Sequence, residues 1–255
     1  MDIRPIKAFS DNYIWAICNP NTKQVALVDP GDAQPALEFL QAHNMRLTAI
    51  ILTHHHNDHI GGVSELLQHT KVPVYGPQSK FIPVVTNPVT DGAQIFLAEQ
   101  DLHLNVMEIP GHTLDHIALY NDEMLFCGDT LFCGGCGRIF EGTPQQMLNA
   151  MQKLANLKPQ TKVYCGHEYT QSNLKFALQV EPQNSSLQQR LIAVTALRNQ
   201  GLPTVPSTMQ EELATNPFLR TQIPAVSAAI AAHWHKQFKD QIEVFAALRE
   251  WKNSI

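Results

Sequence analysis

The segment Thr53–His59 reads Thr-His-His-His-Asn-Asp-His and places four imidazoles and one carboxylate within six consecutive residues. Imidazole nitrogen and carboxylate oxygen are ligands that divalent transition metals accept. In an extended chain alternate side chains share a face, so His54 and His56 point together while His55 points away. The last two residues of the segment then turn back toward a following helix. This spacing predicts a metal site, and the alternative is a solvated His-rich loop.

The elements around this segment favour the metal site. The apolar run 49–52 comes directly before it and is typical of a buried strand. Gly61 and Gly62 follow it, and a helical pattern begins at Val63. A buried strand cannot continue into five polar groups, so the His-rich segment must lie past the end of the strand. That edge of the sheet is where α/β proteins usually bind ligands.

Three later strand ends each offer one more candidate ligand beside a glycine, which lets the backbone approach closely. They are His112, Asp129 and His167, which follow Gly111, Gly128 and Gly166. With His54, His56, Asp58 and His59 they make seven candidate ligands. Seven donors exceed one tetrahedral site with an open position, so the count fits two ions. One ion would take three His, the other one Asp and two His, with Asp129 as the bridge and one hydroxide filling both remaining positions.

Composition limits the classes of partner. The chain has 255 residues, 44% hydrophobic residues, a formal net charge of −5 and five cysteines. No block of Lys and Arg is present, so neither nucleic acid nor an anionic membrane is an expected partner. The N-terminus does not look like a signal peptide, and no apolar run approaches the roughly 18 residues of a membrane span. An odd number of cysteines without an export signal indicates reduced thiols and a cytoplasmic protein.

Strand and helix patterns alternate through the first part of the chain, the order typical of layered α/β architecture. We expect strands at 13–18, 24–28, 49–52, 72–75, 94–97, 102–109, 117–120, 124–127 and 162–165. We expect helices through Ala36 to about His43, from Val63 to His69, and after Thr143, which has Gln146 as its capping-box partner. From about residue 166 apolar residues recur at helical spacing. The predicted domains are an αβ domain over 1–165 and a mainly helical domain over 166–255.

The ligand pattern and its surroundings resemble the metallo-β-lactamase superfamily and, within it, the glyoxalase II (hydroxyacylglutathione hydrolase) family. The resemblance rests on 53–59 and on the stretches 11–15, 28–32, 110–113, 127–132, 135–138, 166–170 and 173–177, and it thins after about residue 185. It implies a four-layer αββα sandwich with a binuclear metal site, followed by a C-terminal helical domain that binds the substrate and covers its thiol side. Zinc is the expected metal, with iron and manganese as alternatives.

The resemblance also implies an activity, the second step of methylglyoxal detoxification. The substrate would be the thioester of S-(2-hydroxyacyl)glutathione, such as S-D-lactoylglutathione, and the products glutathione and a 2-hydroxy acid such as D-lactate. Metal lowers the pKa of bound water to roughly 7, so a hydroxide bridging the two ions would attack the thioester carbonyl. Asp58 would be a ligand and would also orient this hydroxide. A thiol with a pKa of about 8.5 would leave as the thiolate with little acid assistance.

Glutathione carries two carboxylates and therefore needs cationic partners. By similarity to the family, Arg138, Tyr169, Arg249 and Lys252 would bind it. The family often has Tyr where this chain has Phe140, so we expect one hydroxyl donor fewer and weaker glutathione binding. The expected assembly is a monomer with a small-molecule substrate.

Other interpretations stay open from the sequence. Cys133 and Cys136 belong to a Gly-rich loop beside the site, with a redox role as the alternative. His116 is expected to be structural. A persulfide dioxygenase of the same superfamily would need one iron held by two His and one Asp, and the complete second ligand set speaks against it. A nuclease of this fold would want a basic face, and a non-catalytic binding module would not need the complete ligand set.

Overall fold

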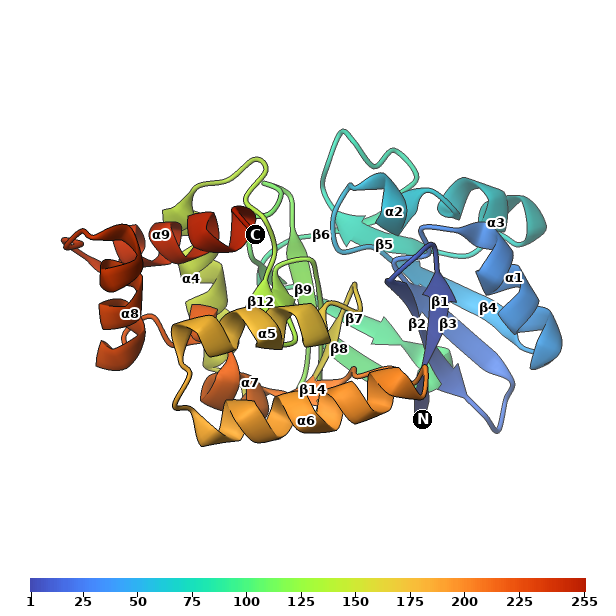
Figure 1. Ribbon diagram of the computed structural model, residues 1–255. Coiled ribbons are helices and arrows are strands. Elements are labelled where there is room, and N and C mark those ends of the chain that lie inside the picture. The colour runs from blue at the N-terminus through green and yellow to red at the C-terminus, as the bar shows by residue number, and fades with distance from the viewer. The chain divides into compact units, whose positions relative to one another are not determined.

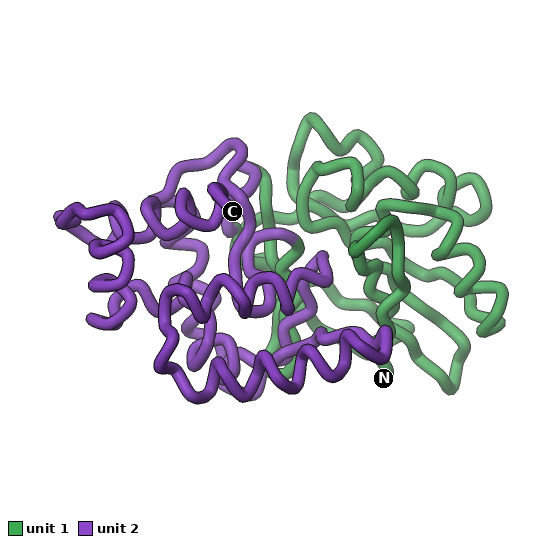
Figure 2. The backbone as a smooth tube through the Cα atoms, viewed as in Figure 1, with its two compact units in different colours: residues 1–108, 115–128 green, residues 109–114, 129–255 purple.

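The computed structural model describes residues 1–255, and contacts within the chain divide it into two compact units (Figure 2). Unit 1 comprises residues 1–108 and 115–128, and unit 2 comprises residues 109–114 and 129–255. The predicted domain border between residues 165 and 166 is a different division of the chain and stays a prediction. None of the helices combines the length and apolar character that a membrane span requires.

The first part of unit 1 is a six-stranded sheet in the order β1-β2-β3-β4-β5-β6. Its strands are β1 (Asp2–Ala8), β2 (Asn12–Asn19), β3 (Gln24–Val28), β4 (Arg46–Ile51), β5 (Val74–Pro77) and β6 (Asn87–Val89). β1 to β3 are antiparallel neighbours, whereas β4, β5 and β6 are added in parallel. Parallel neighbours need crossover connections. Helix α1 (Ala33–Ala42) connects β3 to β4, and helices α2 (Asn57–Ile60) and α3 (Val63–His69) connect β4 to β5.

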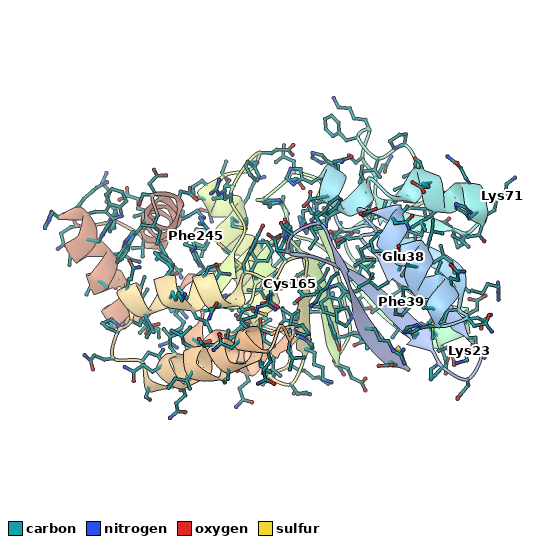
Figure 3. All side chains as sticks on the ribbon, turned by 45° about the vertical axis from the view of Figure 1, so that its right-hand side comes forward. Lys23, Glu38, Phe39, Lys71, Cys165 and Phe245 are labelled. Carbon is teal, nitrogen blue, oxygen red and sulfur yellow. The ribbon has the colours of Figure 1, made fainter.

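One face of this sheet packs against α1 and α3, which lie on the same side of it (Figure 1). The core between them includes Ile14 and Leu66, and Phe39 packs against its edge. Residues on both faces of β2 are buried, as expected for an inner layer of a sandwich. Charged side chains such as Lys23 and Lys71 are exposed at the edge of the unit (Figure 3). The residues that follow β3 and β4 therefore start from strands that are buried in this core.

Unit 1 also contains four antiparallel strands in the order β10-β9-β8-β7. They are β7 (Gln94–Leu97), β8 (Leu102–Glu108), β9 (Ile117–Tyr120) and β10 (Met124–Gly128), with the short helix η1 (Ala98–Gln100) between β7 and β8. The turn between β9 and β10 is closed by Asn121, whose Oδ1 accepts from the amides of Glu123 and Met124. The turn joins two strands that the sequence predicted, at 117–120 and 124–127.

Unit 2 consists of short strand pairs and helices. Its pairs are β11 (Leu131–Phe132) with β12 (Gly135–Cys136), and β13 (Lys162–Cys165) with β14 (Ser207–Thr208). Its helices are α4 (Pro144–Ala155), α5 (Thr170–Val180), α6 (Ser185–Asn199), α7 (Met209–Thr215), η2 (Pro217–Leu219), α8 (Pro224–Trp234) and α9 (Gln241–Asn253). The predicted capping box of Thr143 and Gln146 starts α4. The predicted helical character beyond residue 166 is confirmed.

Two apolar clusters hold these helices. α5 and α6 pack side by side through Leu174 and Leu187 (Figure 1). A second, aromatic cluster joins Phe176 of α5, Phe218 of η2 and Trp251 of α9 by ring contacts. The helical part of unit 2 is thus built around buried leucine and aromatic side chains, which give it a core of its own.

Candidate metal site

In unit 1 three imidazoles gather just past the end of β4. His54 and His59 are 0% and 1% exposed, and their ring centroids lie 4.2 Å apart. The ring of His56, which precedes α2 as its N-cap residue, lies 4.9 Å from that of His54. Asp58 lies in the first turn of α2, with its Oδ2 3.6 Å from Nε2 of His59. Four of the seven predicted ligands therefore lie together in this unit.

A buried carboxylate that the sequence did not single out orients two of these rings. Asp29, directly after β3, accepts from the amide (2.8 Å) and hydroxyl (2.6 Å) of Thr53 and from Nδ1 of His59 (3.0 Å). The Thr53 hydroxyl donates its hydrogen bond to Asp29, so its oxygen accepts from Nδ1 of His54 at 3.0 Å. Both histidines therefore carry the proton on Nδ1 and present Nε2 as the ligand atom. Asp29 could itself hold a metal ion together with His54 and His59. Its three hydrogen bonds indicate instead that it orients the neighbouring histidine rings.

Neighbouring residues constrain both the carboxylate and the backbone of Asp58. Asn12 donates from Nδ2 to Oδ2 of Asp58 at 2.9 Å. A Cβ atom on Gly31 would lie 1.7 Å from the carbonyl oxygen of Asp58, so only glycine fits there. The Asp-Pro-Gly turn after β3 thus serves the site in two ways, through the Asp29 carboxylate and through the space left by Gly31.

Two histidines of unit 1 that the predicted ligand set leaves out have other partners. His116 is fully buried, stacks on His54 with ring centroids 4.5 Å apart, and makes a 3.1 Å hydrogen bond from Nδ1 to the carbonyl of Ile117. His55 pairs through Nδ1 with the carboxylate of Asp115 at 2.9 Å. These contacts support structural roles for both rings.

In unit 2 the other three predicted ligands lie together. His112, Asp129 and His167 are 3%, 6% and 5% exposed and follow β8, β10 and β13. Oδ2 of Asp129 is 3.6 Å from Nε2 of His112 and 3.2 Å from Nε2 of His167. One carboxylate oxygen beside two imidazole nitrogens is compatible with the bridging role predicted for Asp129.

A backbone carbonyl orients His112. Its Nδ1 donates to the carbonyl oxygen of Arg138 at 2.8 Å, which leaves Nε2 as the ligand atom. A Cβ atom on Gly137 would lie 1.9 Å from the carbonyl oxygen of Asp129 and 3.1 Å from Nδ1 of His112. The glycine before Arg138 therefore lets the chain pass between two candidate ligands.

The three cations expected to bind glutathione belong to unit 2 and influence one another. Burial lowers the pKa of Lys252, and the positive charges of Arg249 and Arg138 lower it further. Arg249 is only 6% exposed, donates from Nη1 to the carbonyl of Cys136 at 2.7 Å, and holds its guanidinium 5.1 Å from the ring centroid of Phe218. Arg138 is exposed. A bound anion would relieve the repulsion among these charges, although Arg249 is also a structural residue.

Aromatic rings flank the histidines of unit 2. Tyr169 stacks on His167 with ring centroids 4.7 Å apart and an interplanar angle of 7°. Phe140 is 62% exposed and meets the ring of His112 edge-on at 5.2 Å.

All five cysteines are buried and none is in a disulfide. Burial raises the pKa of Cys136 to about 11, which keeps it a thiol at neutral pH and does not favour a redox role.

Comparison with known proteins assigns the family. Residues 9–167 match the metallo-β-lactamase superfamily, and residues 168–255 match the hydroxyacylglutathione hydrolase C-terminus. A hydroxyacylglutathione hydrolase of Alkalilimnicola ehrlichii is 53% identical over 253 residues, 99% of this chain and 98% of that protein. One of Vibrio parahaemolyticus is 50% identical over 256 residues, 100% of both chains. The chain belongs to the hydroxyacylglutathione hydrolase family.

Solved structures agree on the fold. ETHE1 from Myxococcus xanthus has a TM-score of 0.70 at 24% identity, covering 99% of this chain and 92% of that one. TTHA1623 in a di-iron-bound form has a TM-score of 0.60 at 24% identity, covering 85% and 100%. The predicted α/β class and metallo-β-lactamase fold are confirmed, and the match to hydroxyacylglutathione hydrolases extends past residue 185 to the last residue. Family membership and the His and Asp groups support a binuclear metal site. The individual ligands stay predictions.

Proposed function

We propose that this protein hydrolyses the thioester of S-(2-hydroxyacyl)glutathione, for example S-D-lactoylglutathione, to glutathione and a 2-hydroxy acid. The observation that carries the proposal is the full-length match, at 53% identity, to a protein named hydroxyacylglutathione hydrolase. The match includes both the region with the His and Asp groups and the helical region with Arg249 and Lys252. A persulfide dioxygenase is not favoured, because the relatives that match over the whole chain carry the hydrolase name.

The proposed centre holds two divalent ions, with zinc as the first candidate. Its ligands would be His54, His56, Asp58, His59, His112, Asp129 and His167. The donors fit such ions, because the buried histidines at 54, 59 and 112 each have Nδ1 engaged by an acceptor and so present Nε2. Ions bound there would supply a nucleophile at neutral pH by acidifying a water molecule, and would polarise the thioester carbonyl.

The protein's own groups would position the substrate. Arg138, Arg249 and Lys252 form a cationic cluster whose mutual repulsion favours the carboxylates of glutathione. Tyr169, whose ring stacks on His167, would offer its hydroxyl to glutathione, as the resemblance to the family implies. The leaving thiolate needs little proton donation, so no side chain is required as a general acid. Water acidified by the ions would be the nucleophile, so no cysteine or other side chain is required in that role. The five thiols suit a reducing compartment, and we propose a cytoplasmic monomer.

Metal analysis combined with steady-state hydrolysis tests the proposal. The purified protein should contain about two divalent ions per chain. It should hydrolyse S-D-lactoylglutathione faster than a coenzyme A thioester, and a chelator should abolish the activity. Oxygen consumption with glutathione persulfide in place of thioester hydrolysis would refute the proposed activity.

A further inference from the structure

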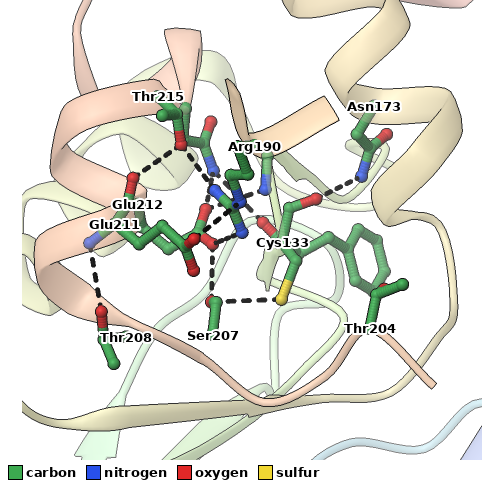
Figure 4. A network of polar contacts seen from close by, with 12 residues as sticks. Cys133, Asn173, Arg190, Thr204, Ser207, Thr208, Glu211, Glu212 and Thr215 are labelled. Atoms are coloured by element: carbon green, nitrogen blue, oxygen red, sulfur yellow. Dashed lines mark hydrogen bonds and ion pairs between the residues drawn. The ribbon is translucent and has the colours of Figure 1, made fainter. Parts of the chain in front are cut away.

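One buried carboxylate connects four segments of unit 2. Glu212 of α7 is 0% exposed and receives four hydrogen bonds (Figure 4). Its Oε1 accepts from Nη2 of Arg190 at 2.5 Å and from the hydroxyl of Ser207 at 2.6 Å. Its Oε2 accepts from the amide of Gly134 at 2.8 Å and from Nδ2 of Asn216 at 3.1 Å. A carboxylate can accept about four hydrogen bonds, so this one is saturated.

Three of those donors come from the helical C-terminal region, but Gly134 does not. It forms the turn between β11 and β12, with a φ of +71° that favours glycine. Arg190 balances the buried charge of Glu212, and losing one partner of such a pair leaves an uncompensated buried charge. The network therefore ties the position of the β11–β12 turn to the packing of α6 and α7.

Other side chains of the same region hold the rest of the hairpin. The two hydrogens of Asn216 Nδ2 are shared between Glu212 and the carbonyls of Phe132 at 3.2 Å and Gly135 at 2.9 Å. Asn173 of α5 donates to the carbonyl of Cys133 at 3.1 Å. The backbone groups of this short hairpin thus depend on the C-terminal helices for their hydrogen bonds, because two paired residues on each side provide few of their own.

The hairpin leads directly to the metal site and to the expected glutathione cation. Two residues beyond β12, the carbonyl of Arg138 accepts the 2.8 Å hydrogen bond that orients His112. The amide of Gly137 donates to the carbonyl of Thr130 at 3.1 Å and fixes that segment. A shift of the hairpin would therefore move the acceptor of His112 and the origin of the Arg138 side chain together.

We infer that Glu212 is a positioning residue for the reaction. It is not among the predicted ligands or glutathione contacts, and it acts through the β11–β12 hairpin on the orientation of His112 and on the placement of Arg138. The inference rests on the proposed function for its link to catalysis. It gives the C-terminal helices a second task, which is to hold a loop of the metal-binding region in place.

The test compares two Glu→Gln variants in the same helical region. Glu212→Gln replaces one acceptor oxygen by an NH2 group that faces two donors, with little change in volume. Glu181→Gln is the matched control, because Glu181 is 8% exposed and pairs with Arg220 at 2.8 and 2.9 Å without contacting the hairpin. Ser207→Ala is a milder variant of the network, since it removes one donor to the carboxylate and the acceptor of the Cys133 thiol but leaves the carboxylate itself.

Three readouts separate positioning from general destabilisation. For Glu212→Gln we expect the KM for S-D-lactoylglutathione and the rate of metal loss to a chelator each to rise about tenfold, the effect typical of lost support for a metal-binding histidine. Amide exchange at Gly134 should accelerate in the same variant. Glu181→Gln should leave KM and metal loss within about twofold of wild type even where it lowers the melting temperature equally. Ser207→Ala should shift all three readouts in the direction of Glu212→Gln by a smaller factor.

The inference is overturned if Glu212→Gln and Glu181→Gln agree in KM, metal loss and exchange at Gly134. If Glu212→Gln does not fold, wild-type values for Ser207→Ala in all three readouts overturn it instead. Its failure is distinct from failure of the proposed function. A wild-type protein inactive toward S-D-lactoylglutathione would refute that function, while metal loss and amide exchange would still decide whether Glu212 positions the hairpin.

Discussion

The two groups of predicted metal ligands are supported in different ways. Unit 1 contributes four residues from one short segment after β4, and Asp29 and Thr53 orient two of their rings from the ends of adjacent parallel strands. Unit 2 contributes three residues that follow three different strands. There a carbonyl on the loop after β12 orients His112. Both groups follow strands, but the rings of His54 and His59 are oriented by side chains at strand ends, whereas His112 is oriented by a carbonyl on a loop that the helices hold.

This difference predicts unequal tolerance to change. A sheet of paired strands opens only with a large part of the fold, while loops with few buried contacts open locally at lower free energy. We therefore expect His112 to lose its orientation more readily than the rings of His54 and His59 do. Variants in each group test this expectation.

The largest effect is expected for the shared carboxylate of unit 2. Asp129→Asn removes a negative charge next to two imidazoles. It should lose metal and activity together, with kcat/KM falling about a thousandfold or more, because a bound ion supplies several kcal/mol of transition-state stabilisation. Metal content and kcat/KM are measured on the same preparation. Retained activity in this variant would contradict the bridging role of Asp129.

A smaller effect is expected for the orienting carboxylate of unit 1. Asp29→Asn keeps the volume but sets an NH2 group against donors from Thr53 and His59, so metal affinity should fall about 10- to 100-fold. Asp32→Asn is the matched control, because Asp32 caps α1 through the amide of Gln34 and Asn caps a helix equally well. Competition with a chelator measures both affinities. Equal metal affinities for the two variants would contradict the role of Asp29 in orienting the metal-binding histidines.

The cationic cluster of unit 2 should give a pH-dependent effect. The pKa of Lys252 is lowered by burial and by two arginines, so this lysine loses its charge at a lower pH than an exposed one. The KM for S-D-lactoylglutathione should rise as the pH approaches that lowered value, and the free energy of unfolding should also rise from there to about pH 10.5. Lys252→Met should raise KM about fivefold at pH 7 and remove its alkaline increase. Lys175→Met, at an exposed position of α5, should reproduce the wild-type profile.

The smallest effect is expected at Phe140. Phe140→Tyr adds a hydroxyl to an exposed ring beside His112, and one new hydrogen bond to glutathione should lower KM about threefold. Steady-state kinetics at fixed pH measures it. An unchanged KM would show that the ring at this position only packs.

Much of the fold was predictable, and the omissions have a physical cause. β9 and β13 begin and end at the predicted residues, because their apolar runs are flanked by clear turn signals. β1 and β6 were not predicted. Both are edge strands of their sheet and contain a proline, Pro5 and Pro88, which edge strands tolerate and a central strand does not. Local pattern alone does not distinguish such strands from loops.

In the site, too, residues close in sequence were predictable and contacts between distant segments were not. The His-rich segment was predictable because its ligands are neighbours in sequence. The orienting role of Asp29 was not, since it exists only once parallel pairing of β3 and β4 brings Asp29 to Thr53. An aspartate directly after a buried strand was the available signal. Likewise, the resemblance indicated Arg249, but its hydrogen bond to the carbonyl of Cys136 appears only in three dimensions.

The path of the chain has a consequence for recombination. The polypeptide passes between the two units three times, after residues 108, 114 and 128, so neither unit is encoded by an uninterrupted stretch of gene. A fragment ending at residue 167 would carry all of unit 1 and only a portion of unit 2. Exchange of the last 88 residues, 168–255, between relatives would therefore succeed only where the recipient's 109–114 and 129–167 already suit the incoming helices.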